Sequence, residues 1–162
     1  MRTRTLERSQ VLPGTPGDVF AFFADARNLE AITPPFLHFT VVTPEPIEMR
    51  VGALIQYRLR LHGIRVNWLT SIQAWAPPHR FVDVQVRGPY ALWHHTHLLE
   101  PHPDGTLMRD VVRYALPVGP LGDLAHTLFV RRDLERIFDY RAAASPSKMR
   151  FAPGSSPGLA AR

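Results

Sequence analysis

The sequence predicts an α+β fold in which a curved antiparallel sheet wraps around a long C-terminal helix and leaves an apolar cavity. Two observations predict it. Residues 36–117 read as six strands separated by short turns, which favours antiparallel neighbours. Residues 121–144 then carry apolar side chains at helical spacing. A cavity between such a sheet and helix is a natural site for a small molecule.

The N-terminal region is expected to supply one further strand and two short helices. Residues 3–12 mix Thr, Leu and Val with polar residues, as strands do. Thr15 suits an N-cap and Pro16 suits the first helical position, so a helix should run from there to about Ala26. A second short helix is expected at residues 28–32, before a pair of prolines. Both helices are too short to be stable alone and should pack on the sheet.

The clearest hairpin joins residues 53–61 to residues 64–75 through His62 and Gly63. A two-residue loop of this kind pairs the residues on either side of it. One face of the hairpin is then apolar and the other polar, which is typical of a sheet with one covered face. A shorter strand is expected before it, at residues 36–43. The apolar face carries Ile55, Tyr57, Leu59, Leu61, Ile64, Val66, Trp68 and Ile72.

The predicted C-terminal helix changes its apolar side about half-way along. At about 100° per residue, the apolar residues around Leu121 lie nearly opposite those around Leu134. We expect the second half to pack on the sheet, and the first half to meet the short helices or the mouth of the cavity. Residues 1–144 should form a single domain. Residues 145–162 are rich in Pro, Gly and Ser and are expected to form a disordered tail.

Composition narrows the class of protein. The chain has no cysteine, which excludes disulfides, zinc–thiolate sites and a thiolate nucleophile. No apolar run approaches the roughly 20 residues of a membrane span, and the N-terminus does not resemble a secretion signal, so a cytoplasmic location is expected. The net charge is +5, but acidic residues are interleaved with the arginines and no nucleic-acid motif appears. Nucleic-acid binding is therefore not expected.

Residues 80–117 place charge on the covered face of the sheet. With a period of two along three strands, this face continues the apolar side of the first hairpin. Burying an unpaired carboxylate is very costly. The polar side chains should therefore either face a wet or ligand-filled pocket or satisfy one another. They are Asp83, Gln85, His95, His97 and Asp110.

The lengths of two turns decide which of these side chains meet. A three-residue turn in the first hairpin places Asp83 opposite His95. A four-residue turn at 101–104 places Asp110 opposite His95 as well. A shift of two residues in this second hairpin would instead place Asp110 beside His97. Two flanking carboxylates would raise the pKa of His95 and favour the imidazolium.

Four interpretations of this polar row stay open. It could be a buried network that only satisfies itself, or a site in which the five residues Asp83, His95, His97, Asp110 and Tyr114 orient a polar group of a ligand. It could serve general acid–base catalysis by His95, oriented by Asp83 or Asp110. The two histidines with a nearby carboxylate could also bind a metal, although the H-x-H pattern is weak on its own.

Several motifs give the chain a resemblance to the START / polyketide-cyclase superfamily, also called SRPBCC, which has a helix-grip fold. The resemblance covers residues 3–144 and implies an apolar cavity under the C-terminal helix, usually without metal or cofactor. Relatives include lipid carriers, hormone-binding proteins and polyketide aromatases, so it implies no particular catalytic residue. The motifs are Pro16-Gly17-Asp18-Val19-Phe20, Trp68-x-Thr70-x-Ile72, Phe81-x-Asp83-x-Gln85-x-x-Gly88-Pro89, Trp93-x-His95-x-His97, Asp110-x-Val112-x-Tyr114-x-Leu116-Pro117, Gly119-Pro120-Leu121-Gly122 and Ile137-Phe138-Asp139-Tyr140-Arg141.

The resulting expectation is a carrier or sensor that binds a hydrophobic or aromatic small molecule, lipid-like or polyketide-like, without a cofactor or metal. One alternative is a polyketide cyclase or dehydratase in which His95 is the acid–base residue, with Asp83 and Asp110 as its carboxylate partners. Another is a non-enzymatic interaction protein that uses the arginine-rich helix face and the tail. The sequence leaves the oligomeric state open. The expected ligand-binding residues are Tyr57, Trp68, Ile72, Phe81, Trp93, His97, Val112 and Tyr114.

Overall fold

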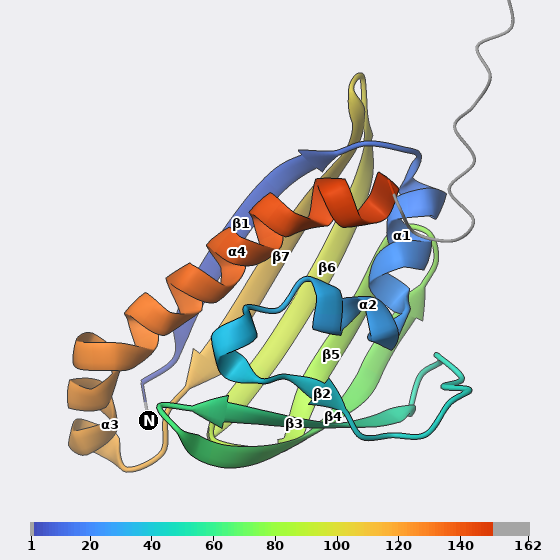
Figure 1. Cartoon of the computed structure of the whole chain (residues 1–162). Helices are drawn as coiled ribbons and strands as arrows, with labels where there is room; N and C mark the ends of the chain where they lie inside the picture. The colour runs from blue at the N-terminus through green and yellow to red at the C-terminus, as the bar shows by residue number, and fades with distance from the viewer. Residues whose placement is uncertain (1, 151–162) are drawn as a thin grey trace, which may run out of the picture.

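A single seven-stranded antiparallel sheet organises the computed structural model, which describes residues 2–150 (Figure 1). Strand order in the sheet is β1-β7-β6-β5-β4-β3-β2, so all neighbours after β1 are also neighbours in the chain. The α+β prediction and the count of seven strands are confirmed. The strands are β1 Arg4–Leu12, β2 Thr40–Val41, β3 Leu54–Leu61, β4 Ile64–Ala76, β5 Arg80–Arg87, β6 Leu92–His102 and β7 Gly105–Ala115.

The helices gather on one face of this sheet, with the C-terminal helix running across β1 and β7 and the short helices beside it (Figure 1). No helix among residues 2–150 is long and apolar enough to cross a membrane. The helical segments are α1 Pro16–Ala24, α2 Ala26–Ala31, the 3₁₀ turn η1 Pro35–Leu37, α3 Gly119–Ala125, the π-helical turn η2 His126–Val130 and α4 Arg131–Arg150.

Helix α1 begins as the sequence predicts. The Thr15 hydroxyl accepts a hydrogen bond from the Asp18 amide at 3.2 Å, and the Asp18 carboxylate accepts one from the Thr15 amide at 2.9 Å. This capping box satisfies two amides that the first helical turn leaves free. The helix then buries Phe20, Phe22 and Phe23 against the sheet. Helix α2 starts two residues earlier than predicted, with Asp25 as its N-cap.

The strand expected at residues 36–43 is wrong for most of its length. Only β2 pairs with β3, at Thr40 and Val41. The preceding residues form η1 instead, because Pro35 fixes a helical φ and His38 adopts a left-handed φ of 45° that ends the turn. This irregular segment covers the front of the sheet and contributes to the cavity described below.

Strand β4 bends the sheet where the cavity lies. Its β3 neighbour pairs in the predicted register, with Leu61 opposite Ile64 and Tyr57 opposite Trp68. On its other side, the pairing with β5 shifts twice, between Leu69 and Thr70 and again just after Ile72. Such bulges increase local twist and bend a strand. The curvature leaves room between the sheet and the helices.

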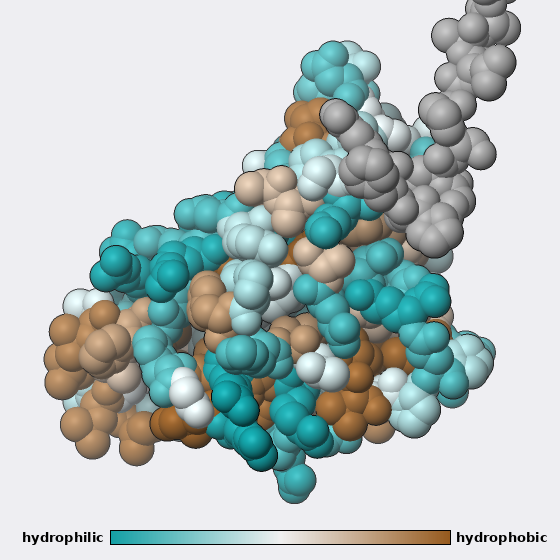
Figure 2. All heavy atoms as spheres, viewed as in Figure 1, coloured by the Kyte–Doolittle hydropathy of each residue, from teal (hydrophilic) through white to brown (hydrophobic). Residues whose placement is uncertain are grey.

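The C-terminal helix is three segments where the sequence suggested one. The π-helical turn η2 shifts the helical phase, and this explains why the apolar side changes. The expected contact of the first half with the short helices or the cavity mouth is wrong, since Leu121, Leu124 and Leu128 are 70%, 57% and 56% exposed. Figure 2 shows hydrophobic residues gathered over α3.

The boundary expected after residue 144 is corrected as well. Helix α4 continues through Ser145 and Pro146 to Arg150, so residues 145–150 are helical and not part of a disordered tail. The Ser145 hydroxyl donates to the Arg141 carbonyl at 2.7 Å and is fully buried. The rest of the predicted tail, and the interaction role considered for it, lies outside the described residues.

Two glycines provide a matched test of the fold. At Gly105, with φ of +137°, a Cβ would lie 2.1 Å from the Leu12 carbonyl oxygen, whereas at Gly63, with φ of +81°, it would meet open space. We expect Gly105→Ala to lower the free energy of unfolding by at least about 3 kcal/mol, since backbone strain adds to a clash with backbone. Gly63→Ala should cost only about 1–2 kcal/mol. Urea unfolding with an unchanged m-value measures both, and equal losses would contradict the assigned close approach.

Candidate functional site

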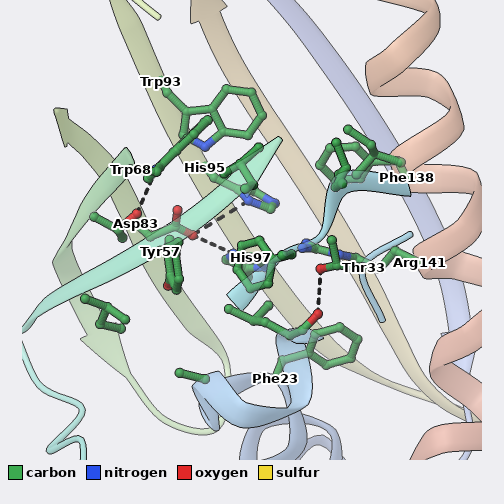
Figure 3. A pocket seen from close by; sticks show the side chains of 18 of the residues that line it. Phe23, Thr33, Tyr57, Trp68, Asp83, Trp93, His95, His97, Phe138 and Arg141 are labelled. Carbon is green, nitrogen blue, oxygen red and sulfur yellow. Dashed lines mark hydrogen bonds and ion pairs between the residues drawn. The ribbon is translucent and has the colours of Figure 1, made fainter. Parts of the chain in front are cut away.

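An apolar cavity of about 160 Å³ lies between the curved sheet and the helices (Figure 3). Its wall comes from both layers: helices α1, α2 and α4 and turn η1 on one side, and strands β3 to β6 on the other. Most of the wall is aromatic or aliphatic, and a small polar group interrupts it. The polar or charged lining residues are Thr33, Tyr57, Thr70, Asp83, Tyr90, His95, His97 and Arg141.

Six of the eight residues expected to bind a ligand line this cavity: Tyr57, Trp68, Ile72, Phe81, Trp93 and His97. The expectation fails for Val112 and Tyr114. Both are buried, but they pack beneath α4 against Leu134 and Phe138. The Tyr114 hydroxyl also lies 2.9 Å from His126 Nε2, at the π-helical turn. Helix α4 therefore covers this part of β7 and separates it from the cavity.

Three aromatic residues form one end of the cavity wall. The indole of Trp68 meets that of Trp93 edge to face, with ring centroids 5.1 Å apart, and Tyr90 packs on both. Gln85 holds the Tyr90 backbone, since its amide donates to the Tyr90 carbonyl at 2.7 Å and its oxygen accepts from the Tyr90 amide at 3.2 Å. The Trp68 indole donates to Thr70 Oγ1 at 3.0 Å. Offset and edge-to-face rings of this kind suit contact with another aromatic ring.

The register of the polar row agrees with one prediction and corrects another. Asp83 lies opposite His95, as expected. Strands β6 and β7 are joined by two residues, since His102 pairs with Gly105, and the four-residue turn expected at 101–104 is wrong. Asp110 therefore lies opposite His97, which is the alternative register.

Asp110 nevertheless reaches both imidazoles, because His95 and His97 point to the same face of β6 (Figure 3). Its Oδ1 lies 2.8 Å from His95 Nε2 and 2.9 Å from His97 Nδ1. On the other side, Asp83 Oδ2 lies 2.9 Å from His97 Nε2 and 3.7 Å from His95 Nδ1. The two imidazole rings are adjacent and tilted by 36°, with centroids 3.8 Å apart. We call these four side chains the His–Asp cluster.

Burial and neighbouring charges shift the pKa values of the two imidazoles in opposite directions. Burial disfavours the charged form of His97, but its close contacts with the carboxylates of Asp110 and Asp83 outweigh this and raise its pKa. Burial lowers the pKa of His95, and the positive charge of His97 lowers it further, against the pull of Asp83 and Asp110. The expectation that His95 would be the imidazolium is therefore wrong, because two carboxylates are shared by two competing imidazoles.

The carboxylates stay ionised within this cluster. Burial alone would raise the pKa of Asp110, yet its hydrogen bond with His95 and its close contact with His97 lower it strongly. Burial opposes ionisation of Asp83 too, and the charges of both histidines lower its pKa. Asp110 is 4% exposed and does not line the cavity, whereas Asp83, His95 and His97 do. Three side chains of the cluster therefore line the cavity, and Asp110 lies behind them.

Arg141 is the charged cavity residue that sequence reasoning missed. It comes from α4, its guanidinium lies over the Phe138 ring at 5.3 Å, and its charge helps to lower the pKa of Asp83. Its Nε has no hydrogen-bond partner among the described residues. The spacing of Leu134, Ile137, Phe138 and Arg141 could have identified it, since residues three, four and seven apart share one helical face.

Comparisons with known proteins agree with this architecture. The family described as polyketide cyclase / dehydrase and lipid transport matches residues 12–139. No curated protein matches the sequence. Among solved structures, the Zhui aromatase/cyclase from Streptomyces sp. R1128 is similar with a TM-score of 0.75 and 13% identity over 96% of this chain and 100% of that one.

Two further structures share the fold at low identity. The protein TTHA0849 from Thermus thermophilus has a TM-score of 0.66 and 19% identity, over 93% of this chain and all of that one. Ara h 8.0201 has a TM-score of 0.65 and 16% identity, with the same coverage of each chain. These likenesses confirm the helix-grip fold that the motifs indicate.

Stability should depend on pH through His97. A raised pKa in the folded state contributes stability that is complete below the unfolded pKa of about 6.5 and is lost as the pH rises through the folded value. Wild-type protein should therefore lose stability above pH 6.5, and His97→Gln should not. Urea unfolding at a series of pH values measures this. The control His79→Gln removes an exposed histidine between β4 and β5, outside the cluster, and should keep the wild-type slope. Equal slopes in wild type and His97→Gln would contradict the assignment.

Proposed function

Because the chain belongs to the polyketide cyclase / dehydrase and lipid transport family, we propose that it binds a compact aromatic or hydrophobic molecule in the cavity beside α4, as a carrier or sensor. The observation that carries the proposal is an apolar, aromatic-walled cavity interrupted by one buried polar cluster. Ligand sites are commonly built this way, with apolar walls for affinity and a few polar groups for orientation.

The size of the cavity favours a small ring system. A dry apolar cavity of roughly 150 Å³ is known to accept benzene. The 160 Å³ here suits one aromatic ring, with Trp68 and Trp93 edge to face at one end. A longer ligand would have to displace side chains that α2 and α4 contribute. A single ring bearing a short substituent therefore fits best without rearrangement.

The polar groups of the wall favour a ligand with one polar substituent. His97 and Asp83 already satisfy each other at 2.9 Å, whereas Arg141 Nε lacks a hydrogen-bond partner among the described residues. A buried donor without a partner costs about 1–3 kcal/mol, so a ligand oxygen that accepts from Arg141 would recover part of that cost. We therefore expect a hydroxyl, carbonyl or carboxylate on the ring to improve affinity.

The binding proposal can be tested with p-cresol and toluene, which differ by one hydroxyl on a single ring, by isothermal titration calorimetry. We expect p-cresol to bind more tightly than toluene. Ile72→Phe fills a lining position that is 2% exposed and should weaken p-cresol binding at least tenfold. Val86→Phe adds the same ring at a position 58% exposed on β5 and should leave the affinity unchanged. Circular dichroism establishes that both variants fold.

Three outcomes would count against this proposal. They are no binding of p-cresol by wild type, no effect of Ile72→Phe in a folded variant, and equal weakening by Val86→Phe. Native mass spectrometry of protein purified from its own host gives an independent readout. A co-purifying apolar molecule supports the carrier role, and consistently empty protein argues against it.

The His–Asp cluster favours a second candidate, a cyclase- or dehydratase-type enzyme. Its lowered pKa leaves His95 neutral near pH 7 and able to accept a proton, while the raised pKa of His97 favours its protonated form. His95 lines the cavity, and Asp110 accepts from its Nε2 at 2.8 Å. In this mechanism, His95 would remove a proton from a carbon next to a carbonyl group. His97 would return a proton to the oxygen on which charge develops.

Benzoylacetone, an aromatic diketone, allows this chemistry to be measured as exchange of its α-protons in D₂O by NMR. If His95 is the base, wild type should accelerate exchange above the buffer rate, and His95→Gln should lose roughly 10²–10⁴-fold of that acceleration while affinity persists. His94→Gln changes the neighbouring residue on the other face of β6 and should act as wild type. Equal loss of affinity and rate in His95→Gln would assign the residue to binding.

A further inference from the structure

We propose that Asp83, His95 and His97 form a binding site for one divalent transition-metal ion, such as Zn²⁺ or Fe²⁺, in the wall of the cavity. Each residue offers a ligand atom, and the three atoms lie within 4.8 Å of one another. All three residues line the cavity. Two imidazoles and one carboxylate are a donor set found in catalytic zinc sites and in non-haem iron sites.

The sheet holds these donors in fixed positions. His95 and His97 are two residues apart on β6, so both side chains project from the same face. Asp83 lies directly opposite His95 on β5, where the backbone pairing fixes its place. A site built on paired strands is more rigid than one built on loops. Metal binding would therefore require side-chain rotation only.

Asp110 provides an independent observation that points to a metal. Metal-bound histidines almost always donate their second ring nitrogen to a carboxylate, carbonyl or water. Here one oxygen of Asp110 faces the far nitrogens of both rings, His95 Nε2 at 2.8 Å and His97 Nδ1 at 2.9 Å. The opposite nitrogens, His95 Nδ1 and His97 Nε2, are those that face Asp83. One nitrogen of each imidazole thus faces Asp110, which would support the ring, and the other nitrogen faces Asp83, which would bind the metal.

The orientation of His97 leaves room for the rotation that a metal would require. Its Nδ1 is buried and makes no well-aligned hydrogen bond, although Asp110 is close. A metal bound between His97 Nε2 and Asp83 would replace their direct hydrogen bond, and a turn of the ring could align Nδ1 with Asp110. The arrangement therefore has an unmet hydrogen bond that metal binding could satisfy.

Charge also favours a cation at this point. The cluster contains two carboxylates, the buried one of Asp110 and the half-buried one of Asp83, and Arg141 is the one arginine or lysine that lines the cavity among the described residues. Buried charges are stable only when they are paired or coordinate a metal. A divalent ion beside Asp83 would supply positive charge in place of a proton on His97.

Three protein ligands would leave at least one coordination position open toward the cavity. Catalytic metal sites keep such a position for water or substrate. A phenolate, hydroxyl or carbonyl oxygen on a ligand in the cavity is the chemical class that would fill it. The metal site does not depend on the proposed binding of an aromatic molecule, because its ligands are side chains of the protein alone.

The test is titration of chelator-treated wild-type protein with Zn²⁺ and Co²⁺ by calorimetry, with Co²⁺ binding also followed by visible absorption. We expect one ion per chain with micromolar or tighter affinity. His97→Gln and Asp83→Asn should each weaken binding at least thirtyfold. Asp110→Asn keeps the three ligands but removes their support, and should weaken binding about 10–100-fold. His62→Gln removes an exposed His–Asp pair and should change nothing.

Three results would each overturn the proposal. The first is that wild type binds no ion, the second is that folded His97→Gln and Asp83→Asn keep full affinity, and the third is that His62→Gln abolishes binding. Should the cluster variants fail to fold, NMR of wild type labelled with ¹⁵N-histidine decides. Zn²⁺ must then shift the ring nitrogens of His95 and His97, and unmoved resonances would refute the site. Ile72→Phe separates the two proposals, since it should lose p-cresol binding and retain Zn²⁺.

Discussion

The buried carboxylate of Asp110 is the interaction on which the functional face of the sheet depends. It is 4% exposed and is compensated by two imidazoles from the neighbouring strand. Without those contacts its charge would be strongly disfavoured, and removing one partner of such a buried pair typically costs about 3–5 kcal/mol. The pairing of β6 with β7 is therefore constrained by charge as well as by backbone hydrogen bonds. A slip of one residue would turn every side chain of β7 to the other face.

Helix α4 completes the site that the sheet begins. The π-helical turn η2 sets its phase, so that Leu134, Phe138 and Arg141 face the sheet while Leu121 and Leu124 in α3 do not. The helix covers Val112 and Tyr114 and leaves the cavity over β3 to β6. A change of helical phase before α4 thus decides which part of one continuous apolar face becomes core and which becomes cavity wall.

Features that follow from local sequence rules, such as the register of one hairpin, could be predicted. Features that depend on several groups competing for the same partner could not. The two-residue loop at His62-Gly63 fixes the β3–β4 register, and alternation identifies the face that carries the cluster. Residues 101–105 include two prolines and a glycine and fit several turn lengths, of which the structure adopts the two-residue loop. The pKa of His95 depends on how two imidazoles share two carboxylates, which pairwise reasoning along a strand does not capture. The place of Arg141 in the cavity could be recognised only once helix α4, which is distant in the sequence, was placed on the sheet.

Placing a charged cluster beside an apolar cavity has a consequence for what can occupy the site. Excluding water strengthens every electrostatic interaction at the wall, so the two carboxylates hold positive charge tightly. That charge can be a proton on His97 or the proposed metal ion between His97 and Asp83. Both use the same nitrogen, and so they exclude each other. An acid–base enzyme would then operate only without the metal, whereas a metal-dependent one would present its open coordination position to the same aromatic-walled cavity.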